Sequence, residues 1–343
     1  MLLIRADGNA KTGAGHMMRC LTVAAAYARG GQEAECRFVC ADEASAALAG
    51  QNGFPAEVLG TDYRDMEAEL PAWERLAQEG RLTASRTVIL VDSYYVTDAY
   101  LEGLRRYGAV ALLDDMAKQC YPVDLVINYN AFADREEYRT LYRGRETALL
   151  TGSGYVPLRE QFVGRSYRVR EQAQTVLVTT GGGDAENIAG KLFELLYREG
   201  MQFFVVVGPF SPHLDEWRRQ EAQCPGLCVC SNVEDMAGLM CRADIAVTAG
   251  GSTIYELAAL GVPFLCFSYA ENQEKLTEYI GRQGIGGFAG AYHKDREQTL
   301  RRMRLLFGEL AADAGLRRRY SDAGKRLADG QGADRLAQAL REL

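Results

Sequence analysis

The 343-residue sequence lacks an apolar run long enough to span a bilayer, and its first residues, MLLIRADGNA, lack the apolar segment of a signal peptide. Positive charge is also scarce. Lys and Arg number 39 against 46 Asp and Glu, which gives a formal net charge of −7, whereas proteins that bind polyanions carry the opposite excess. These absences predict a cytoplasmic protein with no stable membrane association and no nucleic-acid partner.

The chain has few residues arranged to hold a metal ion. Nine cysteines and three histidines are present, but no cysteines show the paired CxxC spacing of a zinc site. The closest approach to a cluster, Cys224, Cys228 and Cys230, has no histidine beside it. We interpret the cysteines as reduced thiols and predict no metal and no cofactor. His213 and His293 are interpreted as ordinary exposed side chains.

Short β-branched or apolar runs alternate with helical patterns along the chain, which is typical of βαβ units and a parallel sheet. The length favours two domains. The run TVILVD, which ends at Asp92, is apolar without alternation and so predicts a strand covered by helices on both faces. The sequence therefore predicts an α/β protein made of two Rossmann-like domains. Residues 1–158 form the first domain, the charged irregular stretch 159–174 forms a linker, and residues 175–343 form the second domain with terminal helices.

The individual elements follow from the same alternation. Predicted strands are 2–5, 34–40, 87–92, 109–113 and 124–128 in the first domain, and 175–180, 203–208, 227–230, 244–249 and 263–267 in the second. Predicted helices of the first half are 16–30, 43–51 and 97–106.

Ligands of doubly wound sheets bind at the carboxyl ends of the strands, so the loops there are the candidate sites. The loop after the first strand contains Gly13 and Gly15, but Met18 occupies the third glycine position of the dinucleotide fingerprint, which argues against NAD. His16 lies where this loop becomes a helix. It is a candidate catalytic base, and the alternative is a helix cap or a satisfied core histidine.

Polar residues also follow three other predicted strands of the first domain. Asp92, in VDSYYVTDAYL, ends a buried strand, and its carboxylate is suited to orienting an imidazole. The alternative for Asp92 is a helix cap or a turn. Together the strand-end residues predict one polar cleft: Asp92, Tyr94, Asp114, Asp115, Asn128 and Asn130.

The second domain contains two glycine turns that follow strands. VTTGGGDAEN places Gly181, Gly182 and Gly183 where backbone N–H groups can cradle a diphosphate, although an ordinary turn explains them equally. In TAGGSTIYELAAL, two glycines precede a helix that opens with Ser252 and Thr253. Glu256 lies one helical turn later and is suited to accepting ribose hydroxyls. A capping box explains Ser252 and Glu256 but not the two glycines.

Five segments together resemble a known family: RADGNxxTGxGHxMRCLTxA (5–24), VDSYY, INYNAFA, SGYVPLRExF and the GGST…E…NQE box. The chain is similar to the UDP-sugar hydrolases of pseudaminic acid biosynthesis, which release UDP from UDP-2,4-diacetamido-2,4,6-trideoxy-β-L-altropyranose. These enzymes are relatives of the MurG-type glycosyltransferases. The resemblance extends to about Gly287 and implies the GT-B fold, in which two Rossmann-like domains face each other across a cleft.

The resemblance implies an inverting hydrolysis in which water attacks the anomeric carbon and UDP leaves. It implies that His16 is the catalytic base or the residue that orients the water, that Asn272 faces the sugar or the water, and that Tyr94 lines the same pocket. Asp92 joins these catalytic candidates because of its position at a strand end, not through the resemblance. The residues that it implies in binding UDP are Gly181, Gly182, Gly183, Val233, Met236, Gly251, Ser252, Thr253 and Glu256. The first loop and the start of its helix add Gly13, Gly15 and Arg19 as candidate UDP-sugar-binding residues.

Two other functions fit the same motifs. One is an inverting glycosyltransferase that uses a UDP-sugar donor and a soluble acceptor. The other is a non-catalytic nucleotide-sugar-binding protein. The N-terminal half shows no apolar or basic membrane-docking patch for a lipid acceptor, which favours water as acceptor. The partner predicted from the sequence is a small UDP-sugar, and the predicted state is a monomer or weak oligomer.

Overall fold

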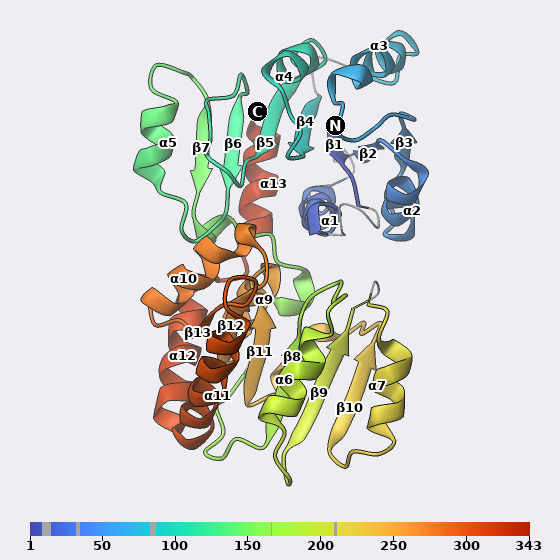
Figure 1. Ribbon diagram of the computed structural model, residues 1–343. Helices are drawn as coiled ribbons and strands as arrows, with labels where there is room; N and C mark the ends of the chain where they lie inside the picture. Colours follow the sequence, from blue (N-terminus) through green and yellow to red (C-terminus); the bar gives the residue numbers. More distant parts are fainter. Residues whose placement is uncertain (9–14, 32–34, 83–86, 166, 209–210) are drawn as a thin grey trace. The chain divides into compact units, whose positions relative to one another are not determined.

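The computed structural model describes residues 1–343 except 9–14, 32–34, 83–86, 166 and 209–210. It divides into two compact units, each built on one parallel sheet (Figure 1). The first unit comprises Met1–Pro157 together with Gln331–Leu343, and the second comprises Leu158–Gly330. None of the described helices is long and apolar enough to cross a membrane. Within the same residues, no group of three or more His, Cys, Asp or Glu side chains is placed to hold a metal ion.

The first unit contains a seven-stranded parallel sheet in the order β3-β2-β1-β4-β5-β6-β7. The chain reverses its direction of sheet growth between β1 and β4, so the topological switch point lies between these neighbours. All five residues of β1 and of β4 are buried, as expected for strands with helices on both faces. The strands are β1 (Leu2–Ala6), β2 (Cys36–Cys40), β3 (Ala56–Val58), β4 (Val88–Asp92), β5 (Ala109–Leu113), β6 (Leu125–Asn128) and β7 (Ala148–Thr151).

Helices and an apolar core hold this sheet together. On one face the apolar residues of β4 and β5 pack with Trp73, Tyr100 and Tyr138, all of them buried. Helix α1 begins at Gly15, and its last turn contacts the final helix of the chain. The helices of this unit are α1 (Gly15–Ala28), α2 (Glu43–Gln51), the short 3-10 helix η1 (Glu67–Glu69), α3 (Leu70–Gln78), α4 (Asp98–Leu104), α5 (Arg135–Leu141), η3 (Ser153–Tyr155) and α13 (Gly332–Glu342).

The second unit contains a six-stranded parallel sheet in the order β10-β9-β8-β11-β12-β13, with its switch point between β8 and β11. Phe193, Phe203 and Trp217 meet at ring-centroid distances of 5.5 and 5.8 Å in its core. The strands are β8 (Thr175–Thr179), β9 (Gln202–Val207), β10 (Leu227–Ser231), β11 (Ile245–Ala249), β12 (Phe264–Ser268) and β13 (Gly287–Ala291). The helices are η4 (Glu160–Phe162), α6 (Ile188–Leu196), α7 (Leu214–Glu221), α8 (Met236–Arg242), α9 (Ser252–Leu260), η5 (Glu271–Gln273), α10 (Glu274–Arg282), α11 (Arg296–Ala312) and α12 (Ala314–Leu327).

The predicted fold class is confirmed, but the structure corrects the predicted domain limits at two places. The C-terminal segment Gln331–Leu343 belongs to the first unit, because α13 packs its apolar face on α1. The described residues of the stretch 159–174 belong to the second unit and do not form a linker between the units. In it, the Tyr167 hydroxyl donates to the Ala243 carbonyl at 3.1 Å, and Arg170 pairs with Asp244 at 2.7 Å.

Candidate active site

The switch point of the first sheet brings His16 and Asp92 together. β4 ends at Asp92, and α1 begins at Gly15, so His16 occupies its first turn, as the sequence predicts. The Nδ1 atom of His16 lies 2.6 Å from Asp92 Oδ1. Because a carboxylate only accepts, Nδ1 carries the proton and Nε2 is left as the basic nitrogen. Among the described residues, no hydrogen-bond partner of Nε2 is found.

Arg19 fixes the other side of the Asp92 carboxylate. One turn along α1 from His16, its Nε donates to Asp92 Oδ2 at 2.6 Å and its Nη2 donates to Oδ1 at 2.5 Å. This bidentate geometry is the one in which a guanidinium best matches a carboxylate. The Cys20 thiol lies 3.4 Å from Oδ2. Asp92 is therefore neither a helix cap nor a turn residue, and its carboxylate orients the imidazole.

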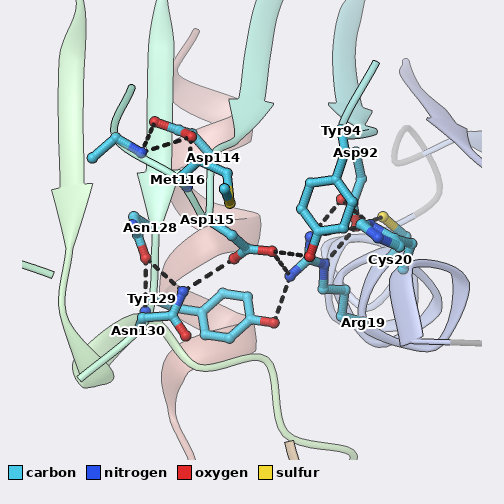
Figure 2. Close-up of polar contacts among 12 residues, drawn as sticks. Arg19, Cys20, Asp92, Tyr94, Asp114, Asp115, Met116, Asn128, Tyr129 and Asn130 are labelled. Carbon is cyan, nitrogen blue, oxygen red and sulfur yellow. Dashed lines mark hydrogen bonds and ion pairs between the residues drawn. The ribbon is translucent and has the colours of Figure 1, made fainter. Parts of the chain in front are cut away.

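The remaining nitrogen of Arg19 reaches residues that follow the next two strands. Nη1 donates to Asp115 Oδ2 and to the Tyr129 hydroxyl, both at 2.8 Å (Figure 2). Asn130 donates to Asp115 Oδ1 at 3.1 Å, and the Tyr94 hydroxyl donates to Asp115 Oδ2 at 3.2 Å. The polar residues after β4, β5 and β6 thus form one connected network, as their predicted positions at adjacent strand ends require.

Tyr94 contacts both this network and His16. Its ring meets the imidazole edge-on, with centroids 4.6 Å apart and an interplanar angle of 82°. Tyr94 is 53% exposed, so its ring covers the imidazole on one side while remaining open to solvent. Partial burial and the charge of Asp115 raise the pKa of the Tyr94 hydroxyl. That hydroxyl is therefore protonated at neutral pH and can donate a hydrogen bond.

The charges in this network stabilise one another. Burial alone would raise the pKa of Asp92, but Arg19 and His16 outweigh it and hold the pKa well below its usual range. Burial likewise opposes the charge of Arg19, yet Asp115 and Asp92 together raise its pKa well above the ordinary value. Burial raises the pKa of Tyr129 to about 12. At neutral pH, Asp92 and Arg19 are both charged.

Asp114, next to Asp115 in the sequence, has a different task. Its side chain accepts the amide hydrogens of Met116 and Ala117 at 2.9 and 3.1 Å and a hydrogen bond from Tyr138 at 2.9 Å. Asn128 donates to the same tyrosine at 2.8 Å. Asp114 and Asn128 therefore fix the conformation of the loop that carries Asp115.

In the second unit, the N-terminus of α9 lies at the switch point of the second sheet. Its cap residue is Gly251, which has no side chain to accept the first-turn amides. The capping-box alternative for Ser252 and Glu256 is thus wrong, because neither side chain caps the helix. In the part of the chain that the structure describes, no hydrogen-bond partner of the first-turn amides of Ser252 and Thr253 is found, and the positive end of a helix favours an anion at such amides.

The Gly181–Gly183 turn follows β8, the strand beside β11. The three glycines are exposed, and Gly181 has a φ of +92°. No hydrogen-bond partner of their amides is found among the described residues. Helix α6 starts only at Ile188, and Asp184 already accepts the amides of Ile188 and Ala189 at 2.7 and 2.8 Å. The turn itself, and not the helix that follows it, is available to a diphosphate.

Glu256 and the Asn272 segment flank the same helix N-terminus. Glu256 is largely buried and pairs with Arg159 at 3.1 Å; burial raises the pKa of this carboxyl, and Arg159 opposes the shift. Asn272 lies in η5 and is exposed. The neighbouring Gln273 packs so closely on Gly250 that a Cβ there would lie 2.8 Å from the Gln273 Cβ. Gly250 therefore lets the Asn272 segment approach the start of α9.

Val233 and Met236 lie after β10, at the same edge of the second sheet. Val233 is half-buried in the loop, and Met236 opens α8. The predicted nucleotide residues of this domain thus all follow strands of one parallel sheet. Their roles stay predictions. Gly13 lies outside the described residues, and Gly15 is the first residue of α1.

Sequence reasoning placed Asp115 at a strand end but gave it no role, and it missed Tyr129 and Cys20. Asp115 and Tyr129 lie 96 and 110 positions from the arginine that they contact. The available signal was local: Asp115 follows a buried strand, and Tyr129 lies in the INYNAFA motif. Neither position by itself indicates a shared guanidinium.

Three known proteins resemble the chain in sequence, although no family model matches it. The spore coat polysaccharide biosynthesis protein SpsG of Bacillus subtilis is 28% identical over 59% of this chain and 61% of its own length. The uncharacterized protein MJ1062 of Methanocaldococcus jannaschii is 21% identical over 87% of this chain and 62% of its own. The chain thus spans less than two thirds of these two relatives. The UDP-2,4-diacetamido-2,4,6-trideoxy-beta-L-altropyranose hydrolase of Campylobacter jejuni is 21% identical over 82% of this chain and 97% of its own length.

Solved structures are similar to this structure over nearly the whole chain. MurG of Acinetobacter baumannii has a TM-score of 0.72 at 14% identity and covers 100% of this chain and 99% of its own. The rhamnosyltransferase SpnG complexed with thymidine diphosphate has a TM-score of 0.60 at 15% identity, covering 99% and 98%. The chain has the GT-B fold. Within that fold it is a distant relative of the altropyranose hydrolase.

Proposed function

We propose that this GT-B protein is a nucleotide-sugar hydrolase that cleaves a UDP-2,4-diacetamido-2,4,6-trideoxyhexose of the altropyranose type into UDP and the free sugar. The observation that carries the proposal is the His16–Asp92 pair, with Nδ1 held at 2.6 Å by a buried carboxylate and Nε2 left as the base. The resemblance to the Campylobacter enzyme over 97% of that protein supports the choice of substrate. The proposed setting is the synthesis of pseudaminic acid.

In the proposed reaction, His16 Nε2 takes a proton from a water molecule as the water oxygen attacks the anomeric carbon. The bond from that carbon to the diphosphate oxygen breaks, and UDP leaves with the electron pair. Attack opposite the leaving group inverts the configuration. Asp92 stabilises the imidazolium that forms, as an ionised carboxylate bonded to Nδ1 does in general-base catalysis. Tyr94 and Asn272 are proposed to face the sugar or the attacking water.

The second domain is proposed to hold the nucleotide. The amides of Ser252 and Thr253 at the start of α9, together with those of Gly181 to Gly183, suit the charge that develops on the diphosphate as the bond breaks. Glu256 is proposed to accept hydrogen bonds from the ribose hydroxyls. Val233 and Met236 are proposed to flank the uracil ring of UDP. Gly15 and Arg19 border the proposed sugar site in the first domain.

The test is release of free UDP and free sugar from a panel of UDP-2,4-diacetamido-2,4,6-trideoxyhexoses, with UDP binding measured in parallel by calorimetry. Wild type is expected to release sugar. His16→Ala is expected to lose activity by about 10²- to 10⁴-fold, the usual contribution of a general base, with unchanged UDP affinity. Turnover by His16→Ala equal to wild type would exclude the assigned base.

A transferase is the second candidate, because the structures that share the fold include MurG and a rhamnosyltransferase. Adding a soluble sugar or alcohol acceptor distinguishes the two functions. Transfer that outruns hydrolysis would identify a transferase. Binding of UDP with no release from any donor, with or without acceptor, would favour a non-catalytic binding protein.

A further inference from the structure

Arg19 is shared by two carboxylates. Its Nε and Nη2 contact Asp92, while its Nη1 contacts Asp115 at 2.8 Å. The side chains of Arg19, Asp92 and Asp115 are 12%, 0% and 15% exposed, so water screens their charges only weakly. We call His16, Arg19, Asp92 and Asp115 the Arg19 cluster.

The second carboxylate changes the charge balance of this cluster. With a neutral imidazole, two carboxylates and one guanidinium leave one net negative charge. When His16 takes up a proton, the cluster becomes neutral. Without Asp115, the same proton would leave one net positive charge in a partly buried site, and like charges disfavour that form.

We propose that Asp115 is a positioning residue that tunes His16 as a base: it draws part of the Arg19 charge away from Asp92, so that Asp92 can stabilise a proton on His16. The inference rests on the function proposed above for the role of the base, but the charge coupling itself does not require the substrate. Asp115 contacts neither ring nitrogen of His16 and acts through Arg19.

Three described titratable or charged side chains contact His16: Asp92, Arg19 and Tyr94. Asp92 lies on β4, and Tyr94 lies in the loop after β4. Arg19 lies on α1 itself, with its Nη2 3.2 Å from Nδ1. That nitrogen is a donor facing a protonated nitrogen, so a full positive charge there disfavours the imidazolium. Asp115 is the carboxylate placed to offset it.

Three geometric features separate Asp115 from a merely structural carboxylate. It caps no helix, since the loop amides go to the neighbouring Asp114. Its Oδ2 also accepts from Tyr94, whose ring covers His16. Its Oδ1 accepts from Asn130, so both oxygens are oriented by hydrogen bonds.

The experiment is a pH titration of the histidine side chains by NMR on the full chain labelled with ¹⁵N-histidine. The chain has three histidines, and His16→Gln assigns the His16 signals. Asp115→Asn keeps the shape and removes the charge. The titration midpoint of His16 is expected to move to lower pH by about half a unit, the effect of one charge two contacts away at intermediate dielectric.

Several comparisons serve as controls. Asp115→Glu and Asp115→Gln form a second pair that differs only in charge, and only the Gln variant is expected to show the shift. His213, which contacts Glu216 in the second unit, is an internal reference with an unchanged midpoint. Glu136→Gln removes an exposed carboxylate that pairs with Arg139 and is expected to leave His16 unchanged. Thermal unfolding checks that each variant is folded.

An unchanged or raised His16 midpoint in folded Asp115→Asn and Asp115→Gln would overturn the inference. In the hydrolysis assay, the acid limb of the kcat/KM profile is expected to move to lower pH with the midpoint. The rate above that limb is expected to fall by less than about threefold, because a base weaker by about half a pKa unit loses at most that factor. A shifted midpoint without any hydrolysis by wild type would retain the charge coupling and reject the proposed function. Hydrolysis by wild type, with no shift of the His16 midpoint in the Asp115 variants, would retain the proposed function and reject the charge coupling.

Discussion

At the scale of single residues, the site buries charged side chains only where each has an oppositely charged partner. The Asp92 side chain has no exposed surface, yet its carboxylate is ionised because Arg19 and His16 both contact it. A buried ion pair contributes little net stability when intact, but it is costly to break, because the remaining charge then has no partner. Each member of the set therefore has a predictable and unequal effect when replaced.

Replacing Asp92 by Asn is expected to lower the free energy of unfolding of the first domain by about 1.5–3 kcal/mol at pH 7, because the charge-assisted hydrogen bonds to Arg19 and His16 are lost while Asp115 still pairs with Arg19. The pKa of Asp92 is lowered in the folded state, so its stabilising effect is present above the unfolded pKa of about 3.9 and is lost as pH falls below it. The gap between wild type and Asp92→Asn in urea midpoint should therefore narrow below about pH 4. Glu136→Gln is the control, and a gap that widens on acidification would contradict the assignment.

At the scale of elements, the second site depends on how closely two loops approach. The loop after β11 and the segment after β12 touch at Gly250, where a Cβ would lie 2.8 Å from the Gln273 Cβ and from the Thr277 Cγ2. Real Cβ atoms do not approach other atoms that closely, so any larger residue must push η5 and α10 away from the start of α9.

Gly250→Ala is expected to destabilise the second domain by about 1–3 kcal/mol, the usual cost of overpacking, and to weaken UDP binding. Gly308→Ala is the matched control. Gly308 lies within α11, and a Cβ there meets nothing within 4 Å, so this variant should gain roughly 0.5–1 kcal/mol from helix propensity. Thermal unfolding and calorimetry with UDP measure both effects. Equal stability of the two variants would show that the close approach at Gly250 is not required.

Most of the elements could be predicted from the sequence because buried strands and amphipathic helices leave strong patterns. The predicted strand 109–113 and helix 43–51 match β5 and α2 residue for residue. The prediction missed β3, β7 and β13. β3 has three residues, none of them buried, and β13 contains two glycines, so neither shows the apolar run that is typical of a buried strand.

The candidate site was predicted in part for the same physical reason. Residues at the ends of parallel strands share one edge, so His16 and Asp92 could be placed together from the strand assignments alone. The contact between Arg19 and Asp115 depends on side-chain direction and on the exact length of the loop after β5. Neither property has a sequence period, so the shared guanidinium was found only in the structure.

At the scale of the whole molecule, the chain passes between the two units twice, after Pro157 and after Gly330. The final helix α13 is amphipathic. An amphipathic pattern predicts that one face of the helix is buried, but it does not show which element covers that face. In the structure that face packs on α1, with Leu336, Ala337 and Leu340 fully buried. The first unit is therefore completed by the last residues of the chain, and the second unit is an insertion within it.

A chain that ends at Gly330 is accordingly expected to lose the structure of its first unit and to keep that of its second. Arg341 normally donates to the Ala26 and Tyr27 carbonyls at 3.1 and 2.9 Å, so truncation removes both the apolar cover of α1 and the partner of its last carbonyls. Hydrogen exchange should show lost protection in β1, β4 and α1 with unchanged protection in β8 and β11. Leu340→Ala is the milder variant, with an expected cost of about 2–5 kcal/mol, and Leu305→Ala, at an exposed position of α11, should change stability by less than about 0.5 kcal/mol. Native protection of β1 and β4 in the truncated chain would show that the first unit folds without α13.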